Sequence, residues 1–306
     1  MNRKTQTALL SVVSNGLLVI AKVIAGLLSG SVSIISEAIH SGVDMVAAII
    51  AYFSVKISSK PADESHPYGH GKFENVSGTV EGLLIFVAAG WIIFEAIEKL
   101  RNPGEIEFPL LGVIVMAVSC VVNIIVSSKL YKVAKAEDSI ALEADALHLR
   151  TDVYTSLGVG IGLLIIWLGD VLFPEYDLVW IDPVIAIIVA LMIIKAAFDL
   201  TKRAVMDLLD VKLPEAEIKE ILEILETNKA HFREFHKFKT RKAGAERFVE
   251  FHMVVPGTMT VRESHDICDL LVSKIKEKYS GIQVIIHVEP DDPEHLKTCS
   301  ATWSGT

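Results

Sequence analysis

The sequence predicts an α-helical membrane domain with six transmembrane helices, followed by a cytoplasmic α+β domain of the open-faced sandwich type. The first observation behind this prediction is that long apolar runs occupy residues 7–206, whereas residues 211–295 have the mixed polarity of a soluble domain. The second is that helix and strand patterns follow one another in the C-terminal segment as α-β-β-α-β. We therefore expect a six-span domain over residues 1–208, a cytoplasmic domain over 209–292 and a disordered tail over 293–306.

A transmembrane helix needs about 20 consecutive and mostly apolar residues. Six stretches reach this length, although the second, third and fifth contain polar residues and give weaker hydropathy signals. The stretches are residues 8–29, 32–57, 78–99, 108–131, 142–168 and 179–202. Lys and Arg gather at the N-terminus, in the loops after the second and fourth stretches, and after the sixth. Because cytoplasmic loops carry the excess of positive charge, we expect a multi-pass protein of the cell (inner) membrane with both termini in the cytoplasm.

The C-terminal segment shows two amphipathic helix patterns and three strand patterns. The predicted helices are residues 214–227 and 260–279, and the predicted strands are residues 233–242, 246–255 and 284–289. Thr260 and Glu263 have the spacing of a capping box at the start of the second helix. This order predicts a small sheet with both helices on one face.

Composition excludes several classes of function. The formal net charge of −9 argues against nucleic acid, because no basic face offsets it, so no nucleic-acid partner is expected. The three cysteines form no CxxC pair, which excludes a disulfide framework and a thiolate zinc cluster and fits a soluble part in a reducing cytoplasm. Neither an HExxH motif nor a nucleophile–base pair is visible, so we expect no enzyme.

Two of the predicted spans contain nearly the same octet of residues. Residues 37–44 in the second span and residues 145–152 in the fifth both place an acid, a histidine and an aspartate at relative positions 0, 3 and 7. Positions three and four apart share one face of a helix. The histidine and final aspartate of each octet therefore project together, and these four residues are His40, Asp44, His148 and Asp152.

Four ionisable groups near the centre of a bilayer need a compensating interaction, because each costs at least about 2.5–3.5 kcal/mol to insert. A divalent cation supplies this interaction, since two imidazole nitrogens and two carboxylates form the tetrahedral shell that zinc favours. Two aspartates also neutralise the charge of the ion. The alternative is that two His–Asp pairs simply hold the helices together.

The loop between the second and third spans contains another possible metal site. Asp63, His66 and His70 lie within eight positions of one another, and Glu64 is an additional carboxylate. Two histidines and an acid in a short loop can bind one metal ion. The alternative is an ordinary solvated polar loop.

Histidines are also concentrated in the C-terminal segment. His236 begins one predicted strand, His252 lies near the end of the next, and His265 lies early in the second helix. His287 and Glu289 end the last strand, where alternation places them on one face. These groups suit a binuclear zinc site, and scattered surface histidines are the alternative.

Taken together, the two octets, the loop sequence PADESHPYGHGKFE at residues 61–74 and the histidine-bearing soluble domain resemble the cation diffusion facilitator family. The resemblance covers residues 5 to about 292, and it is strongest to the bacterial zinc/proton antiporters of that family. It implies a homodimer in the lipid bilayer that exports metal by alternating access against an inward flow of protons.

The resemblance also assigns roles to the three groups of residues. The transport site of the family maps onto His40, Asp44, His148 and Asp152, the loop site onto Asp63, His66 and His70, and the cytoplasmic binuclear site onto His236, His252, His265, His287 and Glu289. Bacterial relatives carry aspartate at the position of His40, and the family carries aspartate at the position of Glu289.

The function that we expect is therefore divalent metal/proton antiport. Zinc is the expected substrate, with cadmium, iron and cobalt as further candidates, and it is also the expected regulatory or structural ion of the soluble domain. Two rival functions use the same residues. A passive metal channel would show flux independent of a pH gradient, and a membrane-anchored metal sensor would need no site between the second and fifth spans.

Overall fold

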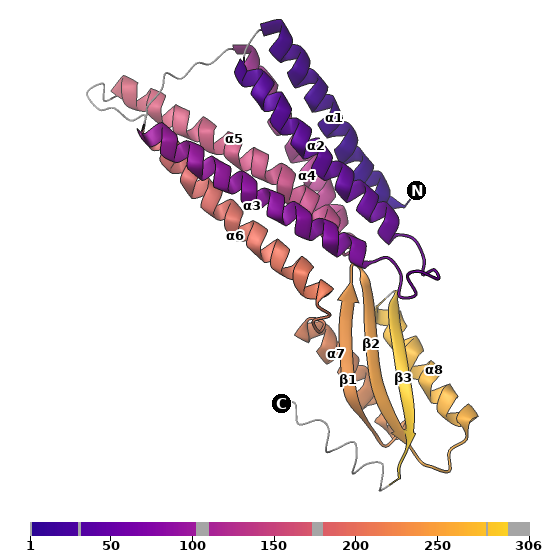
Figure 1. Cartoon of the computed structure of the whole chain (residues 1–306). Coiled ribbons are helices and arrows are strands. Elements are labelled where there is room, and N and C mark those ends of the chain that lie inside the picture. Colours follow the sequence, from indigo (N-terminus) through magenta and orange to yellow (C-terminus); the bar gives the residue numbers. More distant parts are fainter. Residues whose placement is uncertain (1, 30–31, 102–109, 173–179, 280, 293–306) are drawn as a thin grey trace. The chain divides into compact units, whose positions relative to one another are not determined.

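The computed structural model describes residues 2–29, 32–101, 110–172, 180–279 and 281–292 (Figure 1). The chain divides into two compact units, Met1–Val205 and Met206–Thr306. The predicted disordered tail, residues 293–306, lies outside the described residues.

Six long helices form the N-terminal unit. They are α1 (Arg3–Ser29), α2 (Val32–Ser58), α3 (Lys72–Arg101), α4 (Leu110–Ala136), α5 (Ile140–Leu172) and α6 (Ile181–Leu208). Within the described residues, every one of these helices except α5 is long and apolar enough to cross a membrane. The 33-residue α5 carries four charged residues in its first half, Glu143, Asp145, Arg150 and Asp152. These charges include the octet predicted at the metal site.

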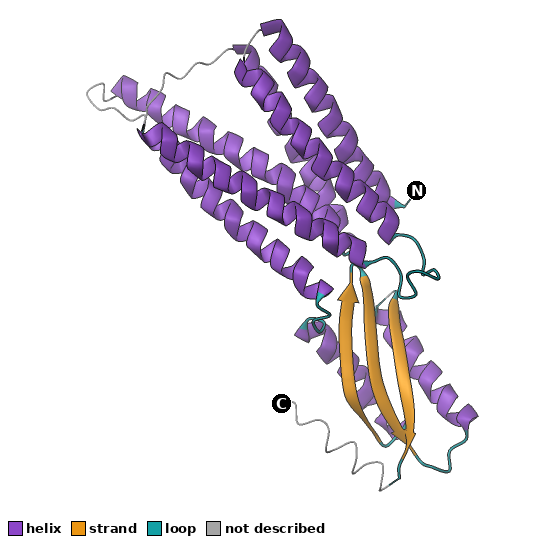
Figure 2. Cartoon of the chain, viewed as in Figure 1, coloured by secondary structure: helices purple, strands orange, loops and turns teal. Residues whose placement is uncertain are grey.

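The C-terminal unit contains all the strands of the described chain (Figure 2). Its elements are α7 (Glu215–Thr227), a short 3₁₀ turn (Lys229–His231), β1 (Glu234–Ala243), β2 (Glu246–Val255), α8 (Val261–Lys278) and β3 (Ile282–Pro290). The observed order is the predicted α-β-β-α-β, and the capping box of Thr260 and Glu263 opens α8. The predicted fold class, a helical membrane domain with an α+β domain, is therefore confirmed.

The three strands lie in the order β1-β2-β3, with β1 antiparallel and β3 parallel to the central strand β2. Both helices contribute to one hydrophobic core with the sheet: Ile221 of α7 and Leu271 of α8 pack with Phe251 and Met253 of β2. The two helices therefore cover the same sheet face. The register places His236, His252 and His287 side by side across the three strands.

Small residues dominate the helix contacts in the membrane domain, as is usual where backbones approach closely in lipid. α3 packs against α6 through Ile85 and Ala89, which contact Ile193 and Ala197. Gly82 lies in the same contact. A Cβ atom at this position would lie 2.0 Å from Thr201 Oγ1 and 3.2 Å from Thr201 Cβ.

We predict that Gly82→Ala destabilises the membrane domain by about 1–3 kcal/mol, because overpacking forces neighbouring groups to shift. Gly90→Ala is the matched control, since it lies in the same helix and its added Cβ would have no atom within 4 Å. The measurement is the thermal unfolding of the purified protein in detergent. Equal melting temperatures for the two variants would contradict the close α3–α6 contact.

Candidate metal sites

The two octets meet through one direct contact in the membrane domain. His148 Nε2 on α5 lies 2.9 Å from Asp44 Oδ1 on α2, and both side chains are buried. The histidine of one octet thus contacts the aspartate of the other instead of the aspartate of its own helix. This geometry brings the octets together, as the proposed metal quartet requires.

Further groups surround this contact. Asp152 lies one turn beyond His148 on α5, and its charge acts on the imidazole. Asn123 on α4 donates a hydrogen bond of 3.4 Å from Nδ2 to Asp152 Oδ2, which is the kind of contact that orients a metal-binding carboxylate. His148 Nδ1 is buried and has no hydrogen-bond partner in the described part of the chain. A buried imidazole and two carboxylates are ligands that zinc accepts.

The fourth predicted member of the quartet is His40. The backbone of α2 is described at this position, but the side chain of His40 lies outside those that the structure describes. Its participation therefore stays a prediction.

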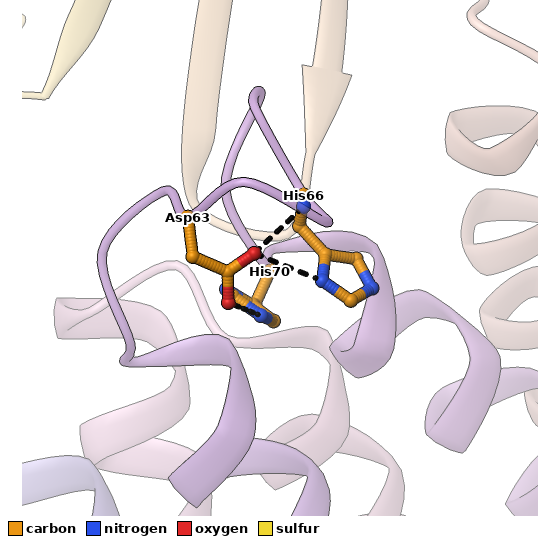
Figure 3. A group of neighbouring side chains, drawn as sticks. All are labelled: Asp63, His66 and His70. Atoms are coloured by element: carbon orange, nitrogen blue, oxygen red, sulfur yellow. Dashed lines mark hydrogen bonds and ion pairs between the residues drawn. The ribbon is translucent and has the colours of Figure 1, made fainter.

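The predicted loop site lies between α2 and α3, and the structure brings its three residues together (Figure 3). His66 Nδ1 lies 3.4 Å from Asp63 Oδ1, and His70 Nε2 lies 3.3 Å from Asp63 Oδ2. The two imidazole rings are 4.3 Å apart between centroids. One ligand atom from each residue falls within 4.8 Å of the others. This spacing suits a single metal ion.

The backbone of the loop prepares Asp63 as a ligand. The N–H groups of Ser65 and His66 both donate to Asp63 Oδ1, at 2.9 and 2.7 Å. The hydrogen bond from the His66 N–H is the main cause that lowers the pKa of Asp63 below its usual value. Asp63 therefore stays ionised, as metal binding requires. His70 Nδ1 is buried without a hydrogen-bond partner among the described residues.

A second carboxylate–imidazole group lies on the sheet of the C-terminal domain. Glu289, which is only 3% exposed, places Oε1 2.6 Å from His252 Nδ1 and Oε2 3.0 Å from His236 Nε2. The three residues offer ligand atoms within 4.8 Å of one another. Neighbouring strands position them, since His236 and His252 are paired in register across β1 and β2.

The other two predicted ligands of this domain are placed differently. His287 lies beside His252 in register, with Nε2 3.6 Å from Glu289 Oε1. His265 is 71% exposed on α8, where its Nε2 lies 3.5 Å from Asp269 Oδ2. His265 and Glu289 both line an open cavity of about 530 Å³ between α8 and β3. His287 thus borders the compact group, whereas His265 lies outside it.

Several buried polar residues have no role in the predicted sites. Lys22 on α1 is 4% exposed and donates a hydrogen bond of 2.6 Å to Ser41, the residue after His40. Glu81 on α3 is fully buried, and Asp145 on α5 is 1% exposed. The signal that marks Lys22 and Glu81 in the sequence is an ionisable residue inside an apolar span. Asp145 is the first member of its octet.

Comparison with known families matches both units of the chain. Residues 8–209 match the cation efflux transmembrane domain, and residues 213–291 match the cytoplasmic domain of cation efflux proteins. The first match alone covers more than half of the chain.

Individual relatives match along most of their length. An uncharacterized transporter of Synechocystis is 35% identical over 268 residues, 87% of this chain and 84% of the relative. The cation-efflux pump FieF of Shewanella oneidensis is 30% identical over 273 residues, 89% of each chain. An uncharacterized transporter of Methanocaldococcus jannaschii is 34% identical over 289 residues, 94% of this chain and 99% of the relative.

We predict that Asp63→Asn weakens zinc binding at the loop site by at least about tenfold, because it removes the ionised carboxylate that lies between the two imidazoles. Glu64→Gln is the control, as it neutralises the adjacent exposed carboxylate. Equilibrium dialysis of the full-length protein, followed by elemental analysis, measures the bound zinc. The loop would not be a metal site if both variants retained the same amount of zinc as the unmodified protein.

Proposed function

The chain belongs to the cation efflux family, the cation diffusion facilitators, and on this premise we propose that it exports zinc from the cytoplasm in exchange for protons. Membership of this family makes it a multi-pass membrane transporter of cations and not an enzyme. The identity of the metal, the proton exchange and the orientation in the cell inner membrane are our proposals.

The buried contact between His148 and Asp44 is the observation that carries the proposal. It joins two helices through the histidine of one octet and the final aspartate of the other, and Asp152 lies one turn away from that histidine. A histidine and two aspartates from α2 and α5 therefore surround one region of the membrane interior. With His40 as the fourth ligand, the set provides the two nitrogens and two carboxylates that suit tetrahedral zinc.

Competition between zinc and protons at these ligands explains the exchange. Zinc binds neutral imidazole and ionised carboxylate, so its arrival displaces protons from the site. When zinc leaves on the opposite side, the ligands can regain protons from that side. Because one site is occupied by either zinc or protons, the return of the protonated site couples the two flows. We propose alternating access as the movement that exposes the site to each side in turn.

The two other groups of ligands suit regulatory or structural zinc. Both place a carboxylate between imidazoles, in the loop at Asp63 and on the sheet at Glu289. We propose that cytosolic zinc binds the C-terminal domain, stabilises a homodimer and favours transport. The flux would then rise when cytosolic zinc is in excess.

The two rival functions make different use of the same residues. A passive channel needs no competition between zinc and protons, so its flux would not respond to a pH gradient. A membrane-anchored sensor has no use for the buried contact between His148 and Asp44. This contact therefore favours transport over sensing.

We predict that Asp152→Ala abolishes zinc-driven proton movement in proteoliposomes. The partly buried carboxylate of Asp152 helps to neutralise the bound ion, and removal of one charge partner in a protein interior costs about 3–5 kcal/mol, which corresponds to about a hundredfold or more in affinity. The control is Asp199→Ala, the same change at an exposed position of α6. Entrapped pH and zinc indicators measure the two flows. Full exchange by Asp152→Ala would refute the transport site, and wild-type flux that ignores the pH gradient would favour the channel.

We also predict that His40→Asp changes which metals are carried. Replacement of a nitrogen ligand by oxygen makes the quartet richer in carboxylate, so the preference for zinc over manganese should fall. Competition among these metals in the same transport assay gives the measurement, with His231→Asp as a control outside every proposed site. An unchanged order of preference would remove His40 from the transport site.

A further inference from the structure

A pair of buried acids lies beside the proposed transport site without being part of it. Glu81 on α3 is completely buried, and Asp145 on α5 is 1% exposed. Asp145 lies one turn before His148, on the side of the N-terminal end of α5. The charges of Asp145 and His148 both act on Glu81. Asp145 thus continues the face of α5 that carries His148 and Asp152, and Glu81 of α3 lies near enough for the charges of this face to act on it.

Among the described residues, each acid finds a hydrogen-bond partner for one of its two carboxyl oxygens. Ser77 donates to Glu81 Oε1 at 3.2 Å, and Ser11 donates to Asp145 Oδ1 at 3.1 Å. Glu81 Oε2 and Asp145 Oδ2 are buried without a hydrogen-bond partner among the residues described. The amide nitrogen of Asn15, one turn beyond Ser11 on α1, is buried and unpartnered as well. Unsatisfied buried groups of this kind mark a site that binds something further.

A structural acid in the same helix looks different. Glu74 on α3 is also buried, at 1% exposure, but both of its oxygens are partnered. Its Oε1 accepts hydrogen bonds of 2.8 Å from Lys4 and from Ser58, and its Oε2 accepts one from Ser139. Glu74 has a cation to neutralise it and ties several helices together. In the described chain, no Lys or Arg pairs with Glu81, and its hydrogen bond comes from Ser77 of its own helix.

The surroundings of Glu81 favour a proton over a metal ion as the missing partner. Within the described chain, the charged groups that act on Glu81 are Asp145 and His148, both from α5, and its hydrogen-bond partner is the hydroxyl of Ser77 on α3. Two carboxylates cannot both stay charged at low cost in such an interior. Among the described residues, neither Glu81 nor Asp145 belongs to a group of three or more ligand atoms that lie close enough to hold one metal ion.

We propose that Glu81 and Asp145 form a proton-binding site next to the metal quartet, and that the pair releases its proton to the cytoplasm when zinc binds at His148 and Asp44. This inference rests on the proposed function. The carboxyl O–H transfers its proton to water, and the charge of the incoming ion favours the carboxylate that remains. The pair therefore contributes to the coupling of zinc and proton flow without coordinating zinc.

Infrared difference spectroscopy of the full-length protein tests this site directly. Zinc addition should remove the C=O stretching band of a protonated carboxyl, a band that shifts in D₂O. Glu81→Gln should lose this change, and Asp145→Asn should lose or displace it. The matched control is Glu95→Gln in the same helix, where the carboxylate is 57% exposed and pairs with Lys99, and it should keep the band.

Calorimetry in buffers with different heats of ionisation gives a second measurement, the number of protons released per zinc bound. We expect this number to fall by about one proton in Glu81→Gln, while zinc affinity changes less than about tenfold, because the ligands of zinc are intact. Glu95→Gln should release as many protons as the unmodified protein.

Two results would overturn the inference. A band and a proton count that are unchanged in both Glu81→Gln and Asp145→Asn would show that the pair holds no exchangeable proton. Loss of zinc binding in a folded Glu81→Gln variant would show that Glu81 serves the metal itself. The infrared and calorimetric measurements do not depend on transport. If vesicles that contain the wild-type protein showed no proton-coupled flux, that result would refute the proposed function and leave the inference about Glu81 and Asp145 to these two measurements.

Discussion

The interior of a membrane tolerates charge only where another charge neutralises it, and the contact between His148 and Asp44 depends on this constraint. Neither helix could present its octet to lipid at low cost. The packing of α2 against α5 places the two octets against each other instead. The same constraint makes an incoming divalent cation favourable and an empty, fully ionised site unfavourable, which is the physical basis of the exchange that we propose.

The two buried acids of α3, Glu74 and Glu81, differ in their hydrogen-bond and charge partners, and this difference distinguishes a structural acid from a functional one. Glu74 has Lys4 and two hydroxyls around it, and this set stabilises the packing of several helices. Glu81 retains an unsatisfied oxygen and has another acid as its neighbour. The partners of Glu74 offset the cost of burying its charge, whereas Glu81 can lower this cost by binding a proton. A carboxyl group of this kind would serve the proton exchange that we propose.

The loop and the C-terminal domain both hold a carboxylate between two imidazoles, although one backbone is a loop and the other is a β-sheet. In the loop, backbone N–H groups hold Asp63 between His66 and His70. On the sheet, strand register places His236 and His252 around Glu289. Both arrangements position a carboxylate against imidazoles before any ion is bound, which reduces the ordering needed on binding. The two groups therefore offer preformed arrangements for an ion.

Periodicity and local spacing were sufficient for the class of fold and for many candidate ligands. Apolar runs of span length, the α-β-β-α-β order and the capping box at Thr260 depend on neighbours in the chain, so the sequence alone determined them. The grouping of Asp63, His66 and His70 followed for the same reason. Side chains from distant elements required the tertiary structure: it paired His148 with Asp44 across 104 positions, left His265 outside the group at Glu289, and placed Glu81 beside Asp145. Which buried groups meet depends on how helices and strands pack, and packing is a property of the whole chain.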